Sequence, residues 1–211
     1  MPLLLLSLGV GAVPEFIATH VHRPATEVRI GYLNDAALPH VGENFVAAER
    51  DQLAALGYSL IDVTAGDYDQ AAAFSAALDT IDALYVAGGN TFALLAALRR
   101  NGTADVLTQK VHAGLPYVGL SAGSIVTGPS IEPVSLMDDP TCAPDLTDHT
   151  GLGLIDTVII PHADGALPPY PPALIAQIRQ TYEAAYPLTL INDDQALLVD
   201  NSSSPRLISS P

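Results

Sequence analysis

The sequence of 211 residues contains one cysteine, no tryptophan and a single lysine. Because Cys142 has no second cysteine to pair with, an intramolecular disulfide is excluded, and so is a metal site built from several thiolates. A chain without disulfides is typical of a reducing compartment. We therefore expect the protein in the cytoplasm.

Basic residues and long apolar runs are also scarce. Eight Lys and Arg residues stand against 23 Asp and Glu residues, which gives a net charge of −15. Nucleic acid and anionic lipid surfaces would repel such a chain, so neither is an expected partner. No apolar run approaches the roughly 20 residues of a membrane-spanning helix. The opening segment lacks the basic start of a signal peptide, and Leu3–Leu8 is expected to be the first core strand.

Short apolar runs alternate with amphipathic stretches along most of the chain, as in a parallel sheet whose strands are connected by helices. The predicted strands are Leu3–Leu8, Val28–Leu33, Ser59–Val63, Ala83–Val86, Tyr117–Leu120 and Thr157–Ile160, followed by late strands at Leu188–Ile191, Ala196–Val199 and Leu207–Ile208 that are suited to an antiparallel edge. The predicted helices are Glu43–Leu56, Ala71–Leu78, Thr91–Arg100, Ala104–Ala113 and Ala173–Ala185. We expect one α/β domain over residues 1–211, with an open, mostly parallel sheet and helices on both faces.

Two stretches interrupt this alternation. Glu132–Gly151 is rich in aspartate and is interpreted as a surface loop, and Ala163–Pro172 is rich in proline and glycine. Long loops in compact domains are often functional. The acidic residues and the histidine of the first loop fit no recognisable metal-binding spacing, so no metal site is predicted from Asp138, Asp139, Asp145, Asp148 and His149.

The segment Gly119-Leu-Ser121-Ala-Gly123 follows a predicted strand and precedes an apparent helix. This is the context of a nucleophile elbow, in which glycines flank a strained turn that projects a serine from the sheet edge. The N–H groups at the start of the following helix can stabilise an oxyanion. The motif alone also occurs in turns that bind phosphate or simply close tightly, so the sequence context is what favours Ser121 as a nucleophile.

A second strand also runs through glycines into a helix, in Tyr85-Val-Ala-Gly88-Gly89-Asn90-Thr91-Phe92. Loops at the carboxyl ends of parallel strands converge on one crevice. The N–H groups of Gly89 and Ala122 are therefore candidates for an oxyanion hole, with Gly88 as a further possibility. The alternative is that the two glycines only permit a tight turn.

A serine nucleophile needs a base, and the chain has six histidines. His162 ends Thr157-Val-Ile-Ile-Pro-His162, at the carboxyl end of a predicted buried strand, where catalytic loops gather. The remaining histidines lie in predicted loops or within a helix and are interpreted as surface or structural residues: His20, His22, His40, His112 and His149.

The blocks Val-Ala-Gly-Gly-Asn-Thr-Phe-Ala-Leu-Leu, Tyr-Val-Gly-Leu-Ser-Ala-Gly-Ser and Ile-Pro-His occur in this order, and with them the chain resembles the peptidase E and cyanophycinase family from Leu3 to Val199. The resemblance implies a fold like that of class I glutamine amidotransferases, with serine in place of cysteine at the elbow. It implies Ser121 as nucleophile, His162 as base, and Gly89 with Ala122 as the oxyanion hole. It implies no cofactor.

The resemblance also implies an acidic third member of the triad, within Met137-Asp138-Asp139-Pro140. Asp138 is favoured and Asp139 is the near alternative. Some relatives use an acidic residue from a later strand–loop junction, which here would be Asp193 or Asp194. A buried carboxylate at the histidine would hold the correct tautomer and stabilise the imidazolium.

Specificity is expected to differ from that of relatives that release an N-terminal aspartate. Those relatives carry Arg-Glu-x-Arg-Ile-Arg after the catalytic histidine, where this chain has Leu174-Ile-Ala-Gln-Ile-Arg179. Recognition of a carboxylate normally needs a close cation, and the first arginine of the run is replaced by Leu174. Arg179 and Asn90 remain as candidate substrate-binding residues.

The resulting hypothesis is a serine exopeptidase that acts on short peptides, as a monomer or homodimer. A cyanophycinase-like or other amide hydrolase on the same fold is the first alternative. The second is a non-catalytic module that binds a small ligand. Labelling by a serine-directed reagent separates the enzymes from the binding module, and digestion of a peptide library separates the two hydrolases.

Overall fold

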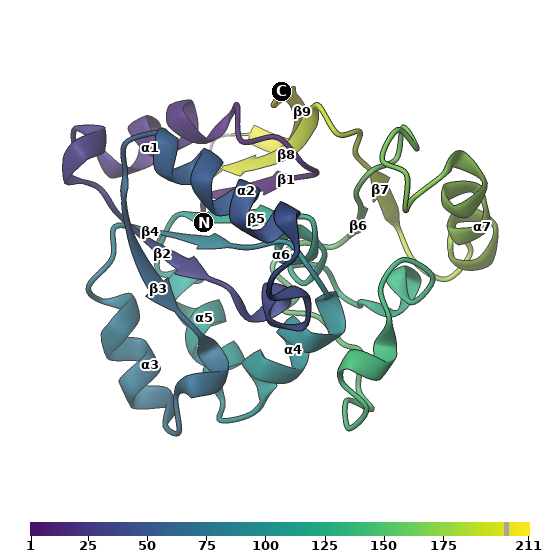
Figure 1. Cartoon of the computed structure of the whole chain (residues 1–211), viewed down its shortest axis with the longest axis horizontal. Coiled ribbons are helices and arrows are strands. Elements are labelled where there is room, and N and C mark those ends of the chain that lie inside the picture. The colour runs from purple at the N-terminus through teal and green to yellow at the C-terminus, as the bar shows by residue number, and fades with distance from the viewer. Residues whose placement is uncertain (201–202) are drawn as a thin grey trace.

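A seven-stranded sheet runs through the centre of the computed structural model, which describes residues 1–200 and 203–211 (Figure 1). Its strand order is β3-β2-β4-β5-β1-β8-β9. The strands are β1 (Leu3–Leu6), β2 (Arg29–Leu33), β3 (Ser59–Val63), β4 (Ala83–Val86), β5 (Tyr117–Leu120), β8 (Gln195–Asp200) and β9 (Ser203–Ser209). The first five in spatial order are parallel, and β8 and β9 add an antiparallel edge.

Both faces of the sheet are buried, which explains the continuous apolar runs of its central strands. In β1, Leu3 and Leu5 belong to one apolar cluster, whereas Leu4 and Leu6 belong to another. All four side chains are fully buried. Because successive side chains of a strand point to opposite faces, the two clusters are the cores above and below the sheet. The expectation of a first core strand is thereby confirmed.

Helices cover both faces, as the sequence predicts (Figure 1). Helices α1 (Val13–Val21) and α2 (Asn44–Ala55) bury apolar residues in the cluster of Leu4 and Leu6. The opposite cluster receives residues of α3 (Ala71–Leu78), α4 (Thr91–Arg99), α5 (Thr103–His112), α6 (Ala122–Ile125) and α7 (Pro172–Tyr182). Within the described residues, no helix has the length and apolar character that crossing a bilayer requires.

Shorter features depart from the expectations. Strands β6 (Val158–Ile160) and β7 (Leu188–Leu190) pair in parallel as a separate two-stranded sheet instead of joining the main one. An apolar run indicates that a strand is buried but does not identify the strand with which it pairs. The sequence therefore could not show that β6 and β7 form a sheet of their own. Helix α1 was not predicted. Single 3-10 turns occur at η1 (Ala25–Glu27), η2 (Asp35–His40), η3 (Ala65–Asp67), η4 (Glu132–Val134) and η5 (Pro140–Cys142), the last two within the predicted loop.

Candidate active site

The predicted elbow is present between β5 and α6. Ser121 has the strained backbone angles φ 46° and ψ −105°, and α6 begins at the next residue. A Cβ on Gly119 would lie 2.4 Å from the carbonyl oxygen of Gly123, and a Cβ on Gly123 would lie 2.2 Å from that of Val86. Both glycines are therefore required by the close approach of backbone segments at this turn.

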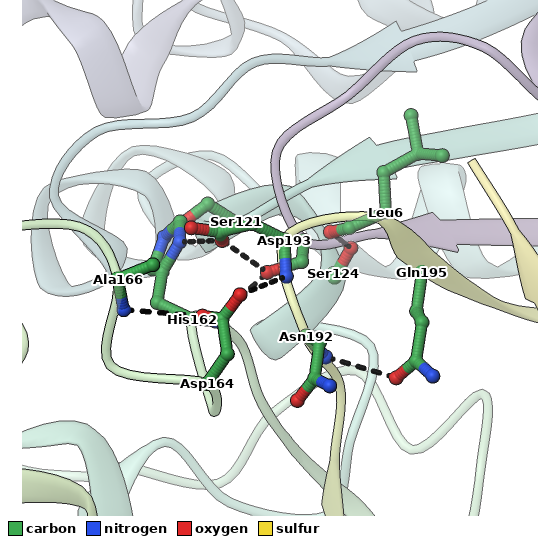
Figure 2. A network of polar contacts seen from close by, with 10 residues as sticks. Leu6, Ser121, Ser124, His162, Asp164, Ala166, Asn192, Asp193 and Gln195 are labelled. Carbon is green, nitrogen blue, oxygen red and sulfur yellow. Dashed lines mark hydrogen bonds and ion pairs between the residues drawn. The ribbon is translucent and has the colours of Figure 1, made fainter. Parts of the chain in front are cut away.

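The turn is tied to the carboxyl end of β1, which is the neighbour of β5 in the sheet. The Ser121 N–H donates to the Leu6 carbonyl at 3.1 Å. The Ser124 hydroxyl also contacts the Leu6 carbonyl, at 2.7 Å (Figure 2). These bonds fix the direction in which the Ser121 side chain leaves the sheet.

Three side chains from distant parts of the chain form a hydrogen-bonded series at this turn (Figure 2). Ser121 Oγ lies 3.2 Å from Nε2 of His162, and Nδ1 of His162 lies 2.6 Å from Oδ1 of Asp193. The His162 side chain is 3% exposed and that of Asp193 is 16% exposed. When Nδ1 carries the ring proton and donates a hydrogen bond to the carboxylate, Nε2 is unprotonated and can accept a hydrogen bond from the serine hydroxyl that it faces. The series has the geometry of a serine hydrolase triad.

Ser7 holds the histidine and the aspartate together, although the sequence analysis did not identify it. Its buried hydroxyl accepts a hydrogen bond from the His162 N–H at 2.8 Å and donates to Asp193 Oδ1 at 3.1 Å. His162 itself has a left-handed backbone, with φ 57°. Ser7 directly follows β1, so the rule that functional residues gather at the carboxyl ends of parallel strands could have identified it.

An aromatic ring supports the other side of the site. Tyr170 stacks on the His162 imidazole with ring centroids 4.7 Å apart and an interplanar angle of 8°. Burial raises the pKa of Tyr170 to about 12, so the ring stays neutral over the physiological range. The proline-rich segment between β6 and α7 therefore contributes a side chain that restricts the histidine ring.

The structure does not place Asp138 where the sequence analysis favoured it. Its carboxylate accepts hydrogen bonds from the N–H and the hydroxyl of Thr91, the first residue of α4. Burial raises the pKa of Asp138, while the bonds from Thr91 and the nearby His40 and His162 oppose that rise. The N-terminal end of a helix attracts a carboxylate, which explains why Asp138 docks there. Asp193, one of the alternatives, occupies the position at His162.

The remaining candidates also make other contacts. Asp139 is exposed and accepts hydrogen bonds from the N–H and hydroxyl of Thr141, which lower its pKa. Asp194 is exposed beside the residue that contacts His162. Arg179 lies on the exposed side of α7 and pairs with Glu183 one helical turn later. Neither the two aspartates nor this arginine contacts the triad within the described part of the chain.

The glycine turn after β4 lies beside the elbow. Gly89 has φ 132°, and a Cβ there would lie 2.1 Å from the carbonyl oxygen of Ala36, so only glycine fits. The N–H groups of Gly89 and Ala122 make no hydrogen bond within residues 1–200 and 203–211. Both therefore remain available to a developing oxyanion.

The neighbours of Gly89 in the turn are already engaged. The Gly88 N–H donates to the carboxylate of Glu49, at 3.1 and 3.2 Å from its two oxygens, so the possible role of Gly88 in the oxyanion hole is not supported. The Asn90 side chain caps α4 by accepting from the Ala93 N–H and donates to the Asp139 carbonyl. Its amide is thus committed to structure, in contrast to the substrate contact expected of it.

No group of three or more His, Cys, Asp or Glu side chains among the described residues is arranged to hold a metal ion. Three aspartates of the loop instead accept hydrogen bonds from backbone N–H and hydroxyl groups: Asp138, Asp139 and Asp148. Asp148, for example, accepts hydrogen bonds from Thr150 and pairs with Arg99, which lower its pKa to about 2. These contacts stabilise the ionised form of the Asp148 carboxylate.

The sequence is similar to those of known peptidases. The family model described as Peptidase family S51 matches residues 12–206. An uncharacterized peptidase of Pasteurella multocida (strain Pm70) is 42% identical over 121 residues, which are 57% of this chain and 56% of that protein. Peptidase E of Streptomyces coelicolor is 42% identical over 87 residues, covering 41% of this chain and 34% of that one. The chain thus spans about half the length, or less, of these relatives.

The fold is also found among solved structures. A crystal structure of a "Putative Peptidase E Protein" from Listeria monocytogenes EGD-e superposes with a TM-score of 0.85. The superposition covers 99% of this chain and 98% of that one, at 24% sequence identity. A peptidase from an acI-B1 actinobacterium matches with a TM-score of 0.70 and 17% identity. These likenesses confirm the expected fold.

Proposed function

We propose that this chain, which belongs to peptidase family S51, is a serine exopeptidase that hydrolyses short peptides. The observation that carries the proposal is the hydrogen-bonded series from Ser121 through His162 to Asp193. The relatives named above are peptidases, so a cyanophycinase-like activity is not favoured. A module that only binds a ligand has no need of a buried histidine held in one tautomer beside a strained serine.

In the proposed reaction, Ser121 Oγ attacks the carbonyl carbon of the scissile peptide bond while His162 Nε2 takes its proton. The N–H groups of Gly89 and Ala122 stabilise the negative charge that develops on the carbonyl oxygen. His162 then gives its proton to the departing amine as the carbon–nitrogen bond breaks. A water molecule attacks the acyl carbon while His162 takes one of its protons. The bond between the acyl carbon and Ser121 Oγ then breaks, His162 returns the proton to Oγ, and the product leaves with its new carboxyl group.

Asp193 serves this reaction through the histidine. Its carboxylate accepts a hydrogen bond from the Nδ1–H of His162, with Oδ1 2.6 Å from Nδ1, and stabilises the imidazolium that forms when Nε2 takes the serine proton. The hydroxyl of Ser7 holds the same carboxylate oxygen and the His162 backbone. Asp193 and Ser7 therefore fix the orientation on which proton transfer depends.

Asp138 is proposed to bind the free amino terminus of the substrate. It is a half-buried carboxylate near His162, and it has no cation among its hydrogen-bond donors in the described residues. A substrate ammonium group would offset the burial that raises its pKa. We expect Asp138→Asn to raise KM for peptides with a free amino terminus. The KM for N-acetylated peptides should not change, and an equal effect on both substrates would contradict this role.

Strict preference for an N-terminal aspartate is not expected. Leu174 stands where relatives that release aspartate carry an arginine, and Arg179 is paired with Glu183 on an exposed helix face. The net charge of −15 also disfavours the approach of acidic peptides. We therefore propose short peptides with neutral or basic residues as substrates.

A dipeptide library with product analysis by mass spectrometry tests the proposed function. We expect free-amino dipeptides to be cleaved by the wild-type protein and not by folded Ser121→Ala. Asp51→Asn, which changes an exposed acid on α2, serves as the matched control and should retain wild-type rates. Cleavage by Ser121→Ala at the wild-type rate would exclude the proposed mechanism.

A further inference from the structure

The turn that carries Gly89 is held from both sides. On one side, η2 contributes the Ala36 carbonyl, which accepts a hydrogen bond from the Asn90 N–H at 2.8 Å and lies against Gly89. On the other side, α2 contributes Glu49, whose two carboxylate oxygens lie 3.1 and 3.2 Å from the Gly88 nitrogen. Gly88 in turn lies against the elbow, because a Cβ added to it would be 3.6 Å from Cβ of Ser121.

The position of Glu49 is an unfavourable one for a carboxylate. Glu49 is only 8% exposed, in a region lined by the aromatic residues Tyr32 and Tyr85. The Tyr85 hydroxyl lies close enough to favour the ionised form of the Glu49 carboxylate, but the two groups do not have the geometry of a hydrogen bond. No described residue forms a hydrogen bond with the hydroxyl of Tyr32 or of Tyr85. Burial therefore dominates and raises the pKa of Glu49 to about 7.

The next residue along α2, Arg50, does not compensate for this burial. Arg50 lies over the Tyr32 ring, 5.0 Å from its centroid, and forms an ion pair with Asp62 of β3. Glu49 thus makes no ion pair within the described residues, and its hydrogen bonds go to the Gly88 N–H alone. A buried acid that is used only on one backbone N–H, next to the candidate oxyanion hole, calls for a functional explanation.

We propose that Glu49 is a positioning residue for the oxyanion hole. Glu49 holds the Gly88 N–H, so that the next N–H, that of Gly89, faces the substrate carbonyl oxygen at Ser121. The inference rests on the proposed function. The Glu49 bond fixes the Ala87–Gly88 peptide plane, one residue before the plane that carries the Gly89 N–H, and the Ala36 carbonyl, which lies against Gly89, fixes Gly89 itself. Because an oxyanion hole works through donors that are already oriented, loss of either support lowers kcat more than it alters substrate binding.

Three substitutions at Glu49 separate positioning from bulk stability. Glu49→Gln keeps an acceptor oxygen at the same length. Glu49→Ala removes the acceptor, and Glu49→Asp keeps the charge but withdraws the acceptor by one methylene. We expect Glu49→Ala and Glu49→Asp to lower kcat by about 10-fold to 100-fold with little change in KM, as other small displacements of groups at an active site do. Gln should keep most of the wild-type kcat, and Asp51→Asn is the control on the same helix.

A second measurement does not depend on peptide specificity. A fluorophosphonate modifies an activated serine, and its phosphoryl oxygen occupies the oxyanion hole during the reaction. We expect the rate of Ser121 modification to fall in Glu49→Ala and Glu49→Asp and to recover in Glu49→Gln. If the wild-type protein reacts in this way but cleaves no peptide, the proposed function fails and the role of Glu49 stands.

Three results would overturn the inference about Glu49. The first is wild-type kcat and modification rate in a folded Ala or Asp variant. The second is a loss of kcat in Glu49→Gln as large as that in Glu49→Asp. The third is an effect of these substitutions on KM alone. If Glu49→Ala does not fold, the comparison of Glu49→Gln with Glu49→Asp still decides the question. Glu49→Asp keeps the carboxylate of the wild type and changes only the position of the acceptor.

Discussion

The raised pKa of Glu49 makes a quantitative prediction about stability. Burial moves this pKa from 4.5 to about 7 in the folded protein. A difference of about 2.5 pKa units corresponds to about 3 kcal/mol at 1.36 kcal/mol per unit. Between the two pKa values the folded protein keeps a proton that the unfolded chain has lost. The free energy of unfolding should therefore fall by about 3 kcal/mol as the pH rises through this window.

Glu49→Gln removes this titration while it keeps the shape of the side chain. Below the unfolded pKa of 4.5, Glu49 is neutral in both states, so wild type and variant should differ by a constant amount. As the pH rises from about 5 to about 8, the wild-type protein should lose stability relative to the variant, and the difference should level off above the folded pKa.

Urea denaturation at several pH values measures this difference. Because the chain has no tryptophan, circular dichroism is the suitable probe. Subtracting the variant from the wild type cancels the titration of all other groups that the substitution leaves unchanged. Parallel stability curves for the wild type and Glu49→Gln would contradict a raised pKa of Glu49 in the folded protein. So would a difference that changes in the opposite direction.

Three further substitutions test the site. Asp193→Asn should lower kcat by about 10⁴-fold with the fold intact, as loss of the correct tautomer does in serine peptidases. Ser7→Ala removes one hydrogen bond from His162 and one from Asp193, and kcat should fall about tenfold with KM unchanged, as steady-state kinetics would show. Gly89→Ala places a Cβ 2.1 Å from the Ala36 carbonyl, so it should lower the melting temperature and reduce kcat by about 10²-fold or more. Wild-type kinetics in any of the three would exclude the role given to that residue.

The sheet and the elbow could be predicted because local sequence determines them. Leu3–Leu6 is apolar throughout because both faces of β1 are buried, and Gly119 and Gly123 flank Ser121 because backbone segments approach closely there. Strand runs therefore predict strands, and the glycines predict the turn. The expected cytoplasmic location remains a prediction that rests on cysteine content.

The acidic partner of His162 could not be predicted in the same way. Asp138 and Asp193 are both aspartates near loops, and the resemblance favoured the one closer to Ser121 in the sequence. Which carboxylate reaches Nδ1 depends on how β7 pairs with β6, since this pairing brings residue 193 beside residue 162. That pairing is a tertiary contact between segments about 30 residues apart, which local patterns do not encode.

Glu49 was equally inaccessible to the sequence analysis. It occurs in a helix with other polar residues and has no motif around it. Only the packing of α2 against the sheet shows that its carboxylate meets the Gly88 N–H. Ser7, by contrast, follows a recognised core strand directly and could have been proposed from its position.

Site-resolved labelling is the most direct test that Ser121 is the nucleophile. The folded protein is treated with a fluorophosphonate and the adduct is located by peptide mass spectrometry, in wild type, Ser121→Ala and His162→Ala. The proposed mechanism predicts one adduct per chain on Ser121 in the wild type, none in Ser121→Ala and a much slower reaction in His162→Ala. An adduct on a different residue, or no adduct on the folded wild-type protein, would contradict it.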